Sequence, residues 1–290
     1  MRSVKFLVAA GAASLLSTAA FAADMPIAPP PMYGPPPVAD FGGWYLRGDI
    51  GFSNQRVQDV KLSNPASYQG LSSFNQTTDF DAAGTYQIGV GYQFNNWFRA
   101  DITGQYRGKS NFQGTDLITF PWGGGTASGS DNYSASKSEF LILANAYADL
   151  GTWWCVTPFI GAGVGAARVS ISNFTDSGLN NANYTALGVP VVSGPPVASF
   201  ATAASASKWN FAWALHAGLG YQVTPNLTLE LAYSYVNLGD GVTGVVSTFD
   251  GSAGGHVFNF RNITSNDLTL GVRWNLDTPP PPPPPLVTKG

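Results

Sequence analysis

Six charged residues are the part of this 290-residue chain whose types and spacing could support chemistry. Three are basic and three are acidic: Arg47, Asp49, Arg99, Asp101, Glu230 and Arg273. Such a set could form a compensated ion-pair network, or it could line a narrow ion path or a proton or ligand relay. The balance of signs favours the network, because each ion in a confined space must be compensated.

Other motifs lack the context that catalysis or cofactor binding requires. The glycine-rich run at 161–166 lies within an expected strand and lacks the following helix of a dinucleotide site. No spacing of serine, histidine and aspartate indicates a nucleophile with its base. His216 is interpreted as a core histidine, and His256 falls in a long connection where a ligand role stays open. The lone Cys155 excludes a disulfide framework. We therefore expect neither an enzyme nor a cofactor.

The elements that must position the six charges are eight segments of about eleven residues with alternating apolar and polar side chains. In the first segment, GWYLRGDIGFS, Trp44 and Leu46 fall on one face, and Arg47 and Asp49 fall on the other. A helix would need apolar spacings of three and four. A soluble sandwich or lipocalin would have a polar outer face. We therefore predict an all-β fold: an eight-stranded antiparallel up-and-down transmembrane β-barrel over residues 43–276.

The two ends of the chain lie outside the predicted barrel. Arg2 and Lys5 precede an apolar run that ends at a small-residue cleavage site, which indicates a signal peptide over 1–22. Residues 23–42 form a proline-rich periplasmic segment, and residues 277–290 a polyproline periplasmic tail. Proline-rich chains adopt an extended conformation and act as spacers.

Connection lengths predict how the barrel is oriented. Three connections are short, at 95–96, 151–156 and 223–226, and four are long, at about 55–83, 108–137, 170–207 and 239–264. Bacterial barrels place short turns in the periplasm and long loops outside, so both termini are expected to be periplasmic. Within two of the long connections, 57–62 and 256–260 could extend the sheet above the membrane or add a hairpin.

Aromatic residues give a second indication of the membrane boundary. Five tryptophans map to the short-turn ends of the segments and are expected to form a membrane girdle: Trp44, Trp97, Trp153, Trp154 and Trp274. The interior of an eight-stranded barrel is only wide enough for its own side chains. With inward-facing charges and glycines, the sequence predicts a filled polar lumen rather than a wide diffusion pore.

Four stretches of the sequence resemble one family of outer-membrane proteins. They are AAFAAD before the proline-rich start, GWYLRGDIG, FAWALHAGLGYQVTPNLTLELAYSY and LTLGVRWNL. The chain resembles the alphaproteobacterial outer-membrane immunogenic proteins, which are small porin-like barrels similar to an OmpA-type barrel domain. It departs from them where Trp274 is followed by two residues and the proline tail, because such barrels usually end at the aromatic residue that closes the last strand.

The resemblance implies an abundant surface antigen in the Gram-negative outer membrane that contributes to envelope integrity. It also implies that Ala23 and Asp24 can serve as an attachment point to peptidoglycan. Expected partners are outer-membrane lipid and lipopolysaccharide, the outer-membrane assembly machinery and peptidoglycan. The acidic net charge of −3 argues against nucleic acid. We expect a monomer with a structural role; the alternatives are a narrow channel for small solutes or a surface receptor, for example for haemin.

Overall fold

The computed structural model describes residues 42–122, 125–181, 183–186, 189–192, 195–249 and 255–277. The expected signal peptide (1–22), Ala23, Asp24 and the tail from residue 278 lie outside the described residues. No helix in these ranges is long and apolar enough to cross a membrane. The structure confirms the all-β, antiparallel, barrel-like architecture.

Twelve strands belong to one antiparallel sheet. They are β1 (Gly43–Arg56), β2 (Asp59–Leu62), β3 (Ser73–Phe80), β4 (Ala83–Gln93), β5 (Phe98–Trp122), β6 (Gly125–Asp149), β7 (Val156–Asn181), β10 (Val197–Ala203), β11 (Ala206–Gln222), β12 (Leu227–Val242), β13 (Val246–Thr248) and β14 (Phe258–Asn275). β8 (Asn183–Ala186) and β9 (Val189–Val192) pair with each other, and η2 (Pro65–Tyr68) is a short 3-10 helix.

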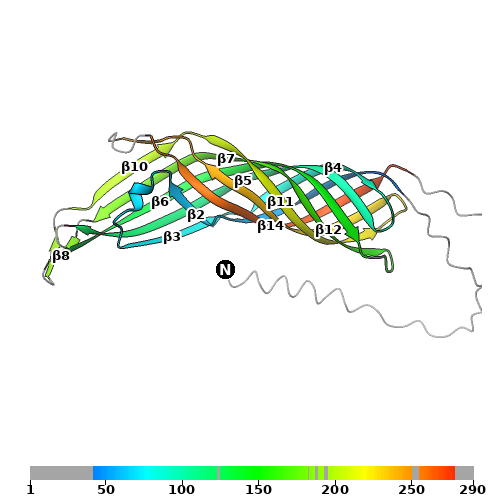
Figure 1. Ribbon diagram of the computed structural model, residues 1–290, viewed down its shortest axis with the longest axis horizontal. Coiled ribbons are helices and arrows are strands. Elements are labelled where there is room, and N and C mark those ends of the chain that lie inside the picture. Colours follow the sequence, from blue (N-terminus) through cyan, green and yellow to red (C-terminus); the bar gives the residue numbers. More distant parts are fainter. Residues whose placement is uncertain are drawn as a thin grey trace, which may run out of the picture. The chain divides into compact units, whose positions relative to one another are not determined.

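The sheet closes on itself. Its pairing order runs β11-β12-β14-β1-β4-β5-β6-β7, and β7 also pairs with β11, so the path returns to its start (Figure 1). The three short connections predicted from the sequence join neighbours in this ring. In one of them the Asn95 side chain accepts hydrogen bonds from the backbone N–H groups of Trp97 and Phe98, at 3.0 and 2.8 Å.

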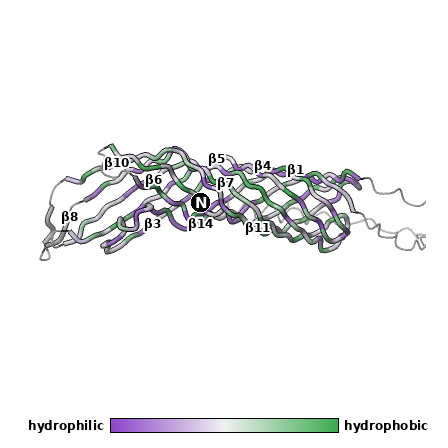
Figure 2. The backbone as a smooth tube through the Cα atoms, turned by 45° about the horizontal axis from the view of Figure 1, so that its top comes forward, coloured by the Kyte–Doolittle hydropathy of each residue, from purple (hydrophilic) through white to green (hydrophobic). Residues whose placement is uncertain are grey.

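The alternation of side chains sets the two faces of the ring. Hydrophobic and hydrophilic residues alternate along the strands (Figure 2). In β1, Leu46 and Ile50 are exposed on the outer face, whereas Arg47 and Asp49 are buried inside. The outward positions pair with further exposed apolar residues, since Ile50 lies between Tyr86 and Leu270. A one-residue slip would turn this apolar band inward, so the band fixes the register.

The prediction of a long loop at 108–137 is wrong. β5 and β6 continue through it as one hairpin, each 25 residues long, and β7 runs for 26 residues. At about 3.3 Å per residue such strands reach roughly 80 Å, well beyond an apolar band about 25 Å tall. In Figure 1 these strands continue far past the end of β4. Their outward positions turn from apolar to polar, because beyond the membrane this face meets water.

The outer half of the ring is built from the strand extensions. β2 pairs with β14, β3 pairs with β5, and β10 lies between β7 and β13. The 57–62 segment thus extends the sheet, the first of the two arrangements left open by the sequence. Among the described residues β2 and β3 share no backbone ladder; instead, the Gln76 amide bonds the N–H and C=O of Val60 at 2.8 and 2.7 Å.

A large part of the interior of the outer half is apolar, contrary to the prediction of a polar lumen. Phenylalanines 112, 174, 258 and 260 pack there in one cluster with Val169, Ile171 and Leu238. Ring centroids lie 4.8 Å apart for Phe174 and Phe258, and 4.9 Å apart for Phe112 and Phe260. The barrel therefore has a polar inner half and a hydrophobic core in its outer half.

Candidate functional site: the charged interior and the outer end of the barrel

The structure brings all six predicted charges together inside the inner half of the ring, which is the half at the short-turn end of the strands. Arg47 is the link between the acidic groups: its guanidinium lies 2.8 Å from Asp49, 3.1 Å from Asp101 and 3.4 Å from Glu230. Each of these side chains is almost fully buried. They come from β1, β5 and β12, so the network ties opposite walls of the ring.

Glu230 is the acidic centre of the network. Besides Arg47, its carboxylate lies 3.2 Å from Arg99 and 3.0 Å from Arg273. Arg99 also pairs with Asp149 at 3.2 Å. Sequence reasoning missed Asp149, because small alanines occupy alternate positions along the end of β6 and hide its apolar and polar faces. The same alternation, continued two residues past Tyr147, would have placed Asp149 inside.

Aromatic rings fill the space between these charges. The Arg99 guanidinium lies over the rings of Tyr147 and Phe159, 4.4 and 4.7 Å from their centroids. Glycines make room for the rings: a Cβ on Gly161 would collide with Tyr147, and one on Gly218 with Phe159. A Cβ on Gly91 would likewise collide with Tyr45, whereas one on Gly89 would come within 3.1 Å of the Arg47 side chain.

A second charged layer lies further out and was not predicted. Arg107 pairs with Asp267, with contacts of 2.5 and 3.1 Å, and Lys137 pairs with Glu139. Gln55 donates to Glu139 at 3.1 Å. These residues lie at the edges of the predicted segments, where the alternation was taken to end. The alternation of inward and outward side chains continues through Lys137 and Glu139, and this continuation is the signal from which the second layer could have been predicted.

Little space remains between the two layers. A cavity there has a volume of about 20 Å³, and it is lined by residues of both, including Arg47 and Asp267. That volume holds about one water molecule. His216 borders the cavity, and its ring nitrogens contact Ser234 Oγ at 2.7 Å and Asn145 Oδ1 at 3.2 Å. His216 is thus a hydrogen-bonded interior histidine.

The five predicted girdle tryptophans lie at one end of the ring, with their side chains exposed. Trp44 and Trp274 flank Leu46, and Trp44 contacts the Tyr92 ring at 5.4 Å. Trp97 lies in the β4–β5 turn. Trp153 and Trp154 lie in the β6–β7 turn, where Trp154 is 97% exposed. Amphipathic rings at this position suit a membrane–water interface.

Three carboxylates gather at the opposite, outer end of the interior. Asp116 and Asp131 are cross-strand neighbours on β5 and β6, and Asp176 on β7 is paired with Tyr133. Asp116 accepts hydrogen bonds from Gln76 and Tyr133, at 2.8 and 2.9 Å. Burial, together with the Asp131 and Asp116 carboxylates, raises the pKa of Asp176 to about 7. This trio was missed because its region was interpreted as loop.

Other chemistry-bearing residues do not gather into a site. Among the described residues, no group of three or more histidine, cysteine or acidic side chains is placed to hold a metal ion. Cys155 is exposed in the β6–β7 turn. His256 lies between β13 and β14, where its backbone C=O accepts a hydrogen bond from Val246.

Comparison with known families agrees with this geometry. The model of the outer membrane protein beta-barrel domain matches residues 8–275. The chain belongs to this family. It is a β-barrel protein of the Gram-negative outer membrane, and the predicted alphaproteobacterial resemblance is confirmed by relatives from Brucella. One, an uncharacterized protein of Brucella abortus, is 30% identical over 239 residues, which are 77% of this chain and 78% of the relative.

More distant family relatives and solved structures are also similar. The outer membrane protein PagN of Salmonella typhimurium is 28% identical over 207 residues, 68% of this chain and 75% of PagN. Neisserial surface protein A matches 82% of this chain and 100% of its own at 16% identity, with a TM-score of 0.41. The outer membrane protein OprG of Pseudomonas aeruginosa matches 81% and 97% at 14% identity, with a TM-score of 0.43.

Replacing the acidic centre should destabilise the barrel strongly. Glu230→Gln leaves three buried guanidiniums around an uncharged amide, and breaking a buried ion pair typically costs about 3–5 kcal/mol. We expect the free energy of unfolding, measured by urea titration of protein refolded into vesicles, to fall by that amount. Asp240→Asn is the control, because the Asp240–Lys208 pair is exposed and worth at most about 1 kcal/mol. Equal losses in the two variants would contradict a central role for Glu230.

The acidic trio predicts pH-dependent stability of the outer end. Asp176 binds its proton in the folded state at a pH where the unfolded chain has lost it, so the free energy of unfolding falls as the pH rises from about 4 to about 7. Asp176→Asn should therefore nearly match the native protein at pH 4 and exceed its amide protection in β6 and β7 at pH 8. Hydrogen exchange measures this, with Asp79→Asn, an exposed carboxylate on β3, as control. Unchanged protection at pH 8 would contradict the prediction.

Proposed function

We propose that this protein is a structural component of the outer membrane whose barrel is closed to solutes. The observation that carries the proposal is the Glu230 network, in which three arginines from three strands converge on one buried carboxylate. The second ion-pair layer and the apolar core lie above it along the same axis. A solute that crosses the lumen would have to break the Glu230 network and the second ion-pair layer, and to displace side chains of the apolar core.

In this proposal eight strands cross the membrane: β1, β4, β5, β6, β7, β11, β12 and β14. The short turns and both termini are periplasmic, and the outer ring projects from the cell. Two observations support this orientation: the tryptophan girdle lies at the short-turn end, and the long strand extensions leave the opposite end. Family barrels place short turns in the periplasm.

The proposed partners follow from the surfaces. The apolar outer band is solvated by outer-membrane lipid and lipopolysaccharide, and insertion requires the assembly machinery. The protein functions as a monomer, with peptidoglycan bound covalently at the mature N-terminus, Ala23-Asp24. The narrow channel remains the competing function, and it requires a continuous water path through the two ion-pair layers.

Planar-bilayer recording distinguishes the closed barrel from the channel. We expect no stable single-channel conductance from the refolded native protein, because the interior charges are paired and about one water molecule fits between their layers. Glu230→Gln should raise the frequency of brief openings, since it removes the group that holds three arginines. A stable native conductance that changes in Glu230→Gln would overturn the closed-barrel proposal.

Mass spectrometry of cell envelopes tests the attachment to the cell wall. After muramidase digestion, we expect the N-terminal peptide that begins at Ala23 to carry a muropeptide mass. Envelopes from a strain that expresses Asp24→Ala are digested in parallel, to show whether the attachment depends on the residue that follows Ala23. An N-terminal peptide that is always unmodified would refute the tether and leave the closed-barrel proposal to the conductance measurement.

A further inference from the structure

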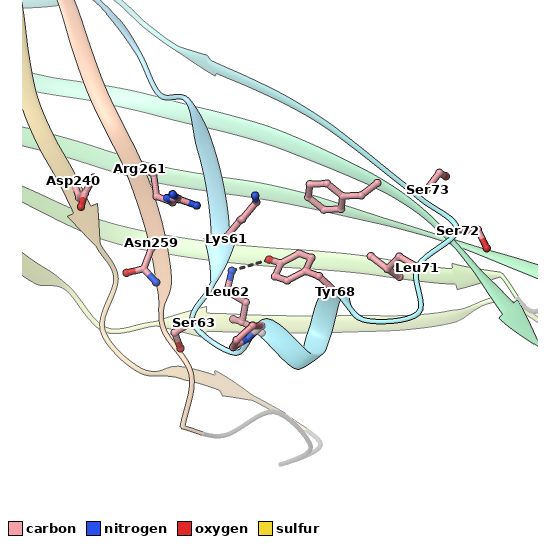
Figure 3. Close-up of a pocket in the computed structure, with 12 residues that line it drawn as sticks. Lys61, Leu62, Ser63, Tyr68, Leu71, Ser72, Ser73, Asp240, Asn259 and Arg261 are labelled. Atoms are coloured by element: carbon pink, nitrogen blue, oxygen red, sulfur yellow. Dashed lines mark hydrogen bonds between the residues drawn. The ribbon is translucent and has the colours of Figure 1, made fainter.

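A pocket of about 730 Å³ lies at the outer end of the barrel, between β2, β14 and the connection that contains η2 (Figure 3). Val60 of β2 and Phe260 of β14 point into the barrel core and are fully buried. Their neighbours along each strand, Lys61 and Arg261, therefore point to the outer face, because successive side chains of a strand alternate. The Lys61–Arg261 side of the pocket thus faces the outside of the ring. Its apolar wall also borders the interior cavity that contains the three carboxylates.

The connection over residues 63–73 forms an ordered apolar wall of this pocket. The Tyr68 hydroxyl accepts a hydrogen bond from the Leu62 N–H at 2.7 Å (Figure 3). The Tyr68 ring packs edge-on against Phe74, with 5.4 Å between the ring centroids. Backbone bonds at both ends anchor the connection, from Ser63 to Val257 at 2.8 Å and from Ser72 to Thr119 at 2.7 Å. The wall is built before any ligand binds, which lowers the entropic cost of binding.

The polar side of the pocket carries an excess of positive charge. Lys61 and Arg261 share a single carboxylate, that of Asp59, at 3.3 and 3.7 Å. Their side chains remain 41% and 55% exposed. The acidic residue of the pocket lining, Asp240, is paired with Lys208 at 3.0 Å. Two cations against one shared carboxylate leave a local positive charge in a chain whose net charge is −3.

We propose that this pocket binds a phosphorylated saccharide. Arg and Lys are the usual partners of phosphate oxygens, and Lys61 and Arg261 would take the phosphate. The apolar faces of sugar rings would pack on Tyr68 and Leu71, while Ser63 and Asn259 offer hydrogen bonds to sugar hydroxyls. A concave site with an apolar wall and a few polar groups is typical of small-molecule recognition.

The position of the pocket favours a glycolipid headgroup as the source of this sugar, given the proposed orientation. On β14 the last exposed apolar residue of the lipid-facing band is Leu268, and Arg261 lies seven residues further out. Seven strand residues span roughly 20 Å. Lys61 and Arg261 would then reach the saccharide layer above the outer leaflet. Soluble phosphorylated sugars share this chemistry, and the experiment separates the two sources.

Calorimetry on the full mature protein in neutral detergent tests the proposal. The probes are lipopolysaccharide, the phosphorylated core oligosaccharide released from it, the same oligosaccharide after phosphatase treatment, and inorganic phosphate. The test variant is Lys61→Gln with Arg261→Gln. The control is Arg168→Gln, an exposed outward arginine on β7 that is not part of the pocket lining. Heat-modifiable electrophoretic mobility verifies that each variant is folded.

We expect the phosphorylated oligosaccharide to bind the native protein and the control alike, and the double variant about tenfold more weakly, as two exposed charge contacts predict. Tighter binding of whole lipopolysaccharide assigns the site to the membrane glycolipid, and equal binding assigns it to the soluble sugar; both support the proposal. Binding that survives phosphatase treatment or the double substitution overturns it. So does inorganic phosphate binding as tightly as the oligosaccharide. None of these outcomes depends on whether the lumen conducts.

Discussion

Closure of the sheet between β7 and β11 is the constraint on which the rest of the structure depends. In lipid no water is available to an unpaired backbone group, so a membrane-spanning sheet can have no open edge. The ladder between these two strands extends from Tyr221 and Val156 to Ala206 and Ile171, and it completes the ring. Once the ring is closed, each inward side chain lies across from the others in a narrow space. The ion pairs and aromatic contacts inside follow from that confinement.

The interior is divided into zones because it meets different needs along its length. In the inner half, buried charges must compensate each other, and Glu230 does so for three arginines. In the outer half the outward face is polar, so the apolar positions of the same strands point inward and pack as an ordinary hydrophobic core. The strands thus reverse their apolar face where they leave the lipid. That reversal makes the outer half a folded extension of the barrel, and it gives the Lys61–Arg261 pocket a rigid support.

Much of the charged interior could be predicted from the sequence, and the failures have specific causes. Arg47 and Asp49 were assigned to the lumen because their neighbours Leu46 and Ile50 mark the lipid face. Asp149 was missed because alanines suit either face. The hairpin of β5 and β6 was taken for a loop because residues 108–137 are rich in glycine, serine and threonine, a composition typical of connections. Within this stretch Phe112 and Tyr133 still follow the two-residue alternation of their strands, and both belong to the hydrophobic core of the outer half.

Within most of the eight predicted segments, the sequence by itself determined the side of the wall on which a residue lies, because the period of two is a local property of an extended chain. It also determined that the outer face of the wall is solvated by lipid, because a band of exposed leucine, isoleucine and tryptophan is favourable in lipid and unfavourable in water. Only the tertiary structure decided which charges meet. Arg107 and Asp267 are 160 positions apart, and Arg47 reaches carboxylates on three strands. These contacts depend on how far neighbouring strands are shifted relative to one another when the ring closes, and no local sequence pattern encodes that shift.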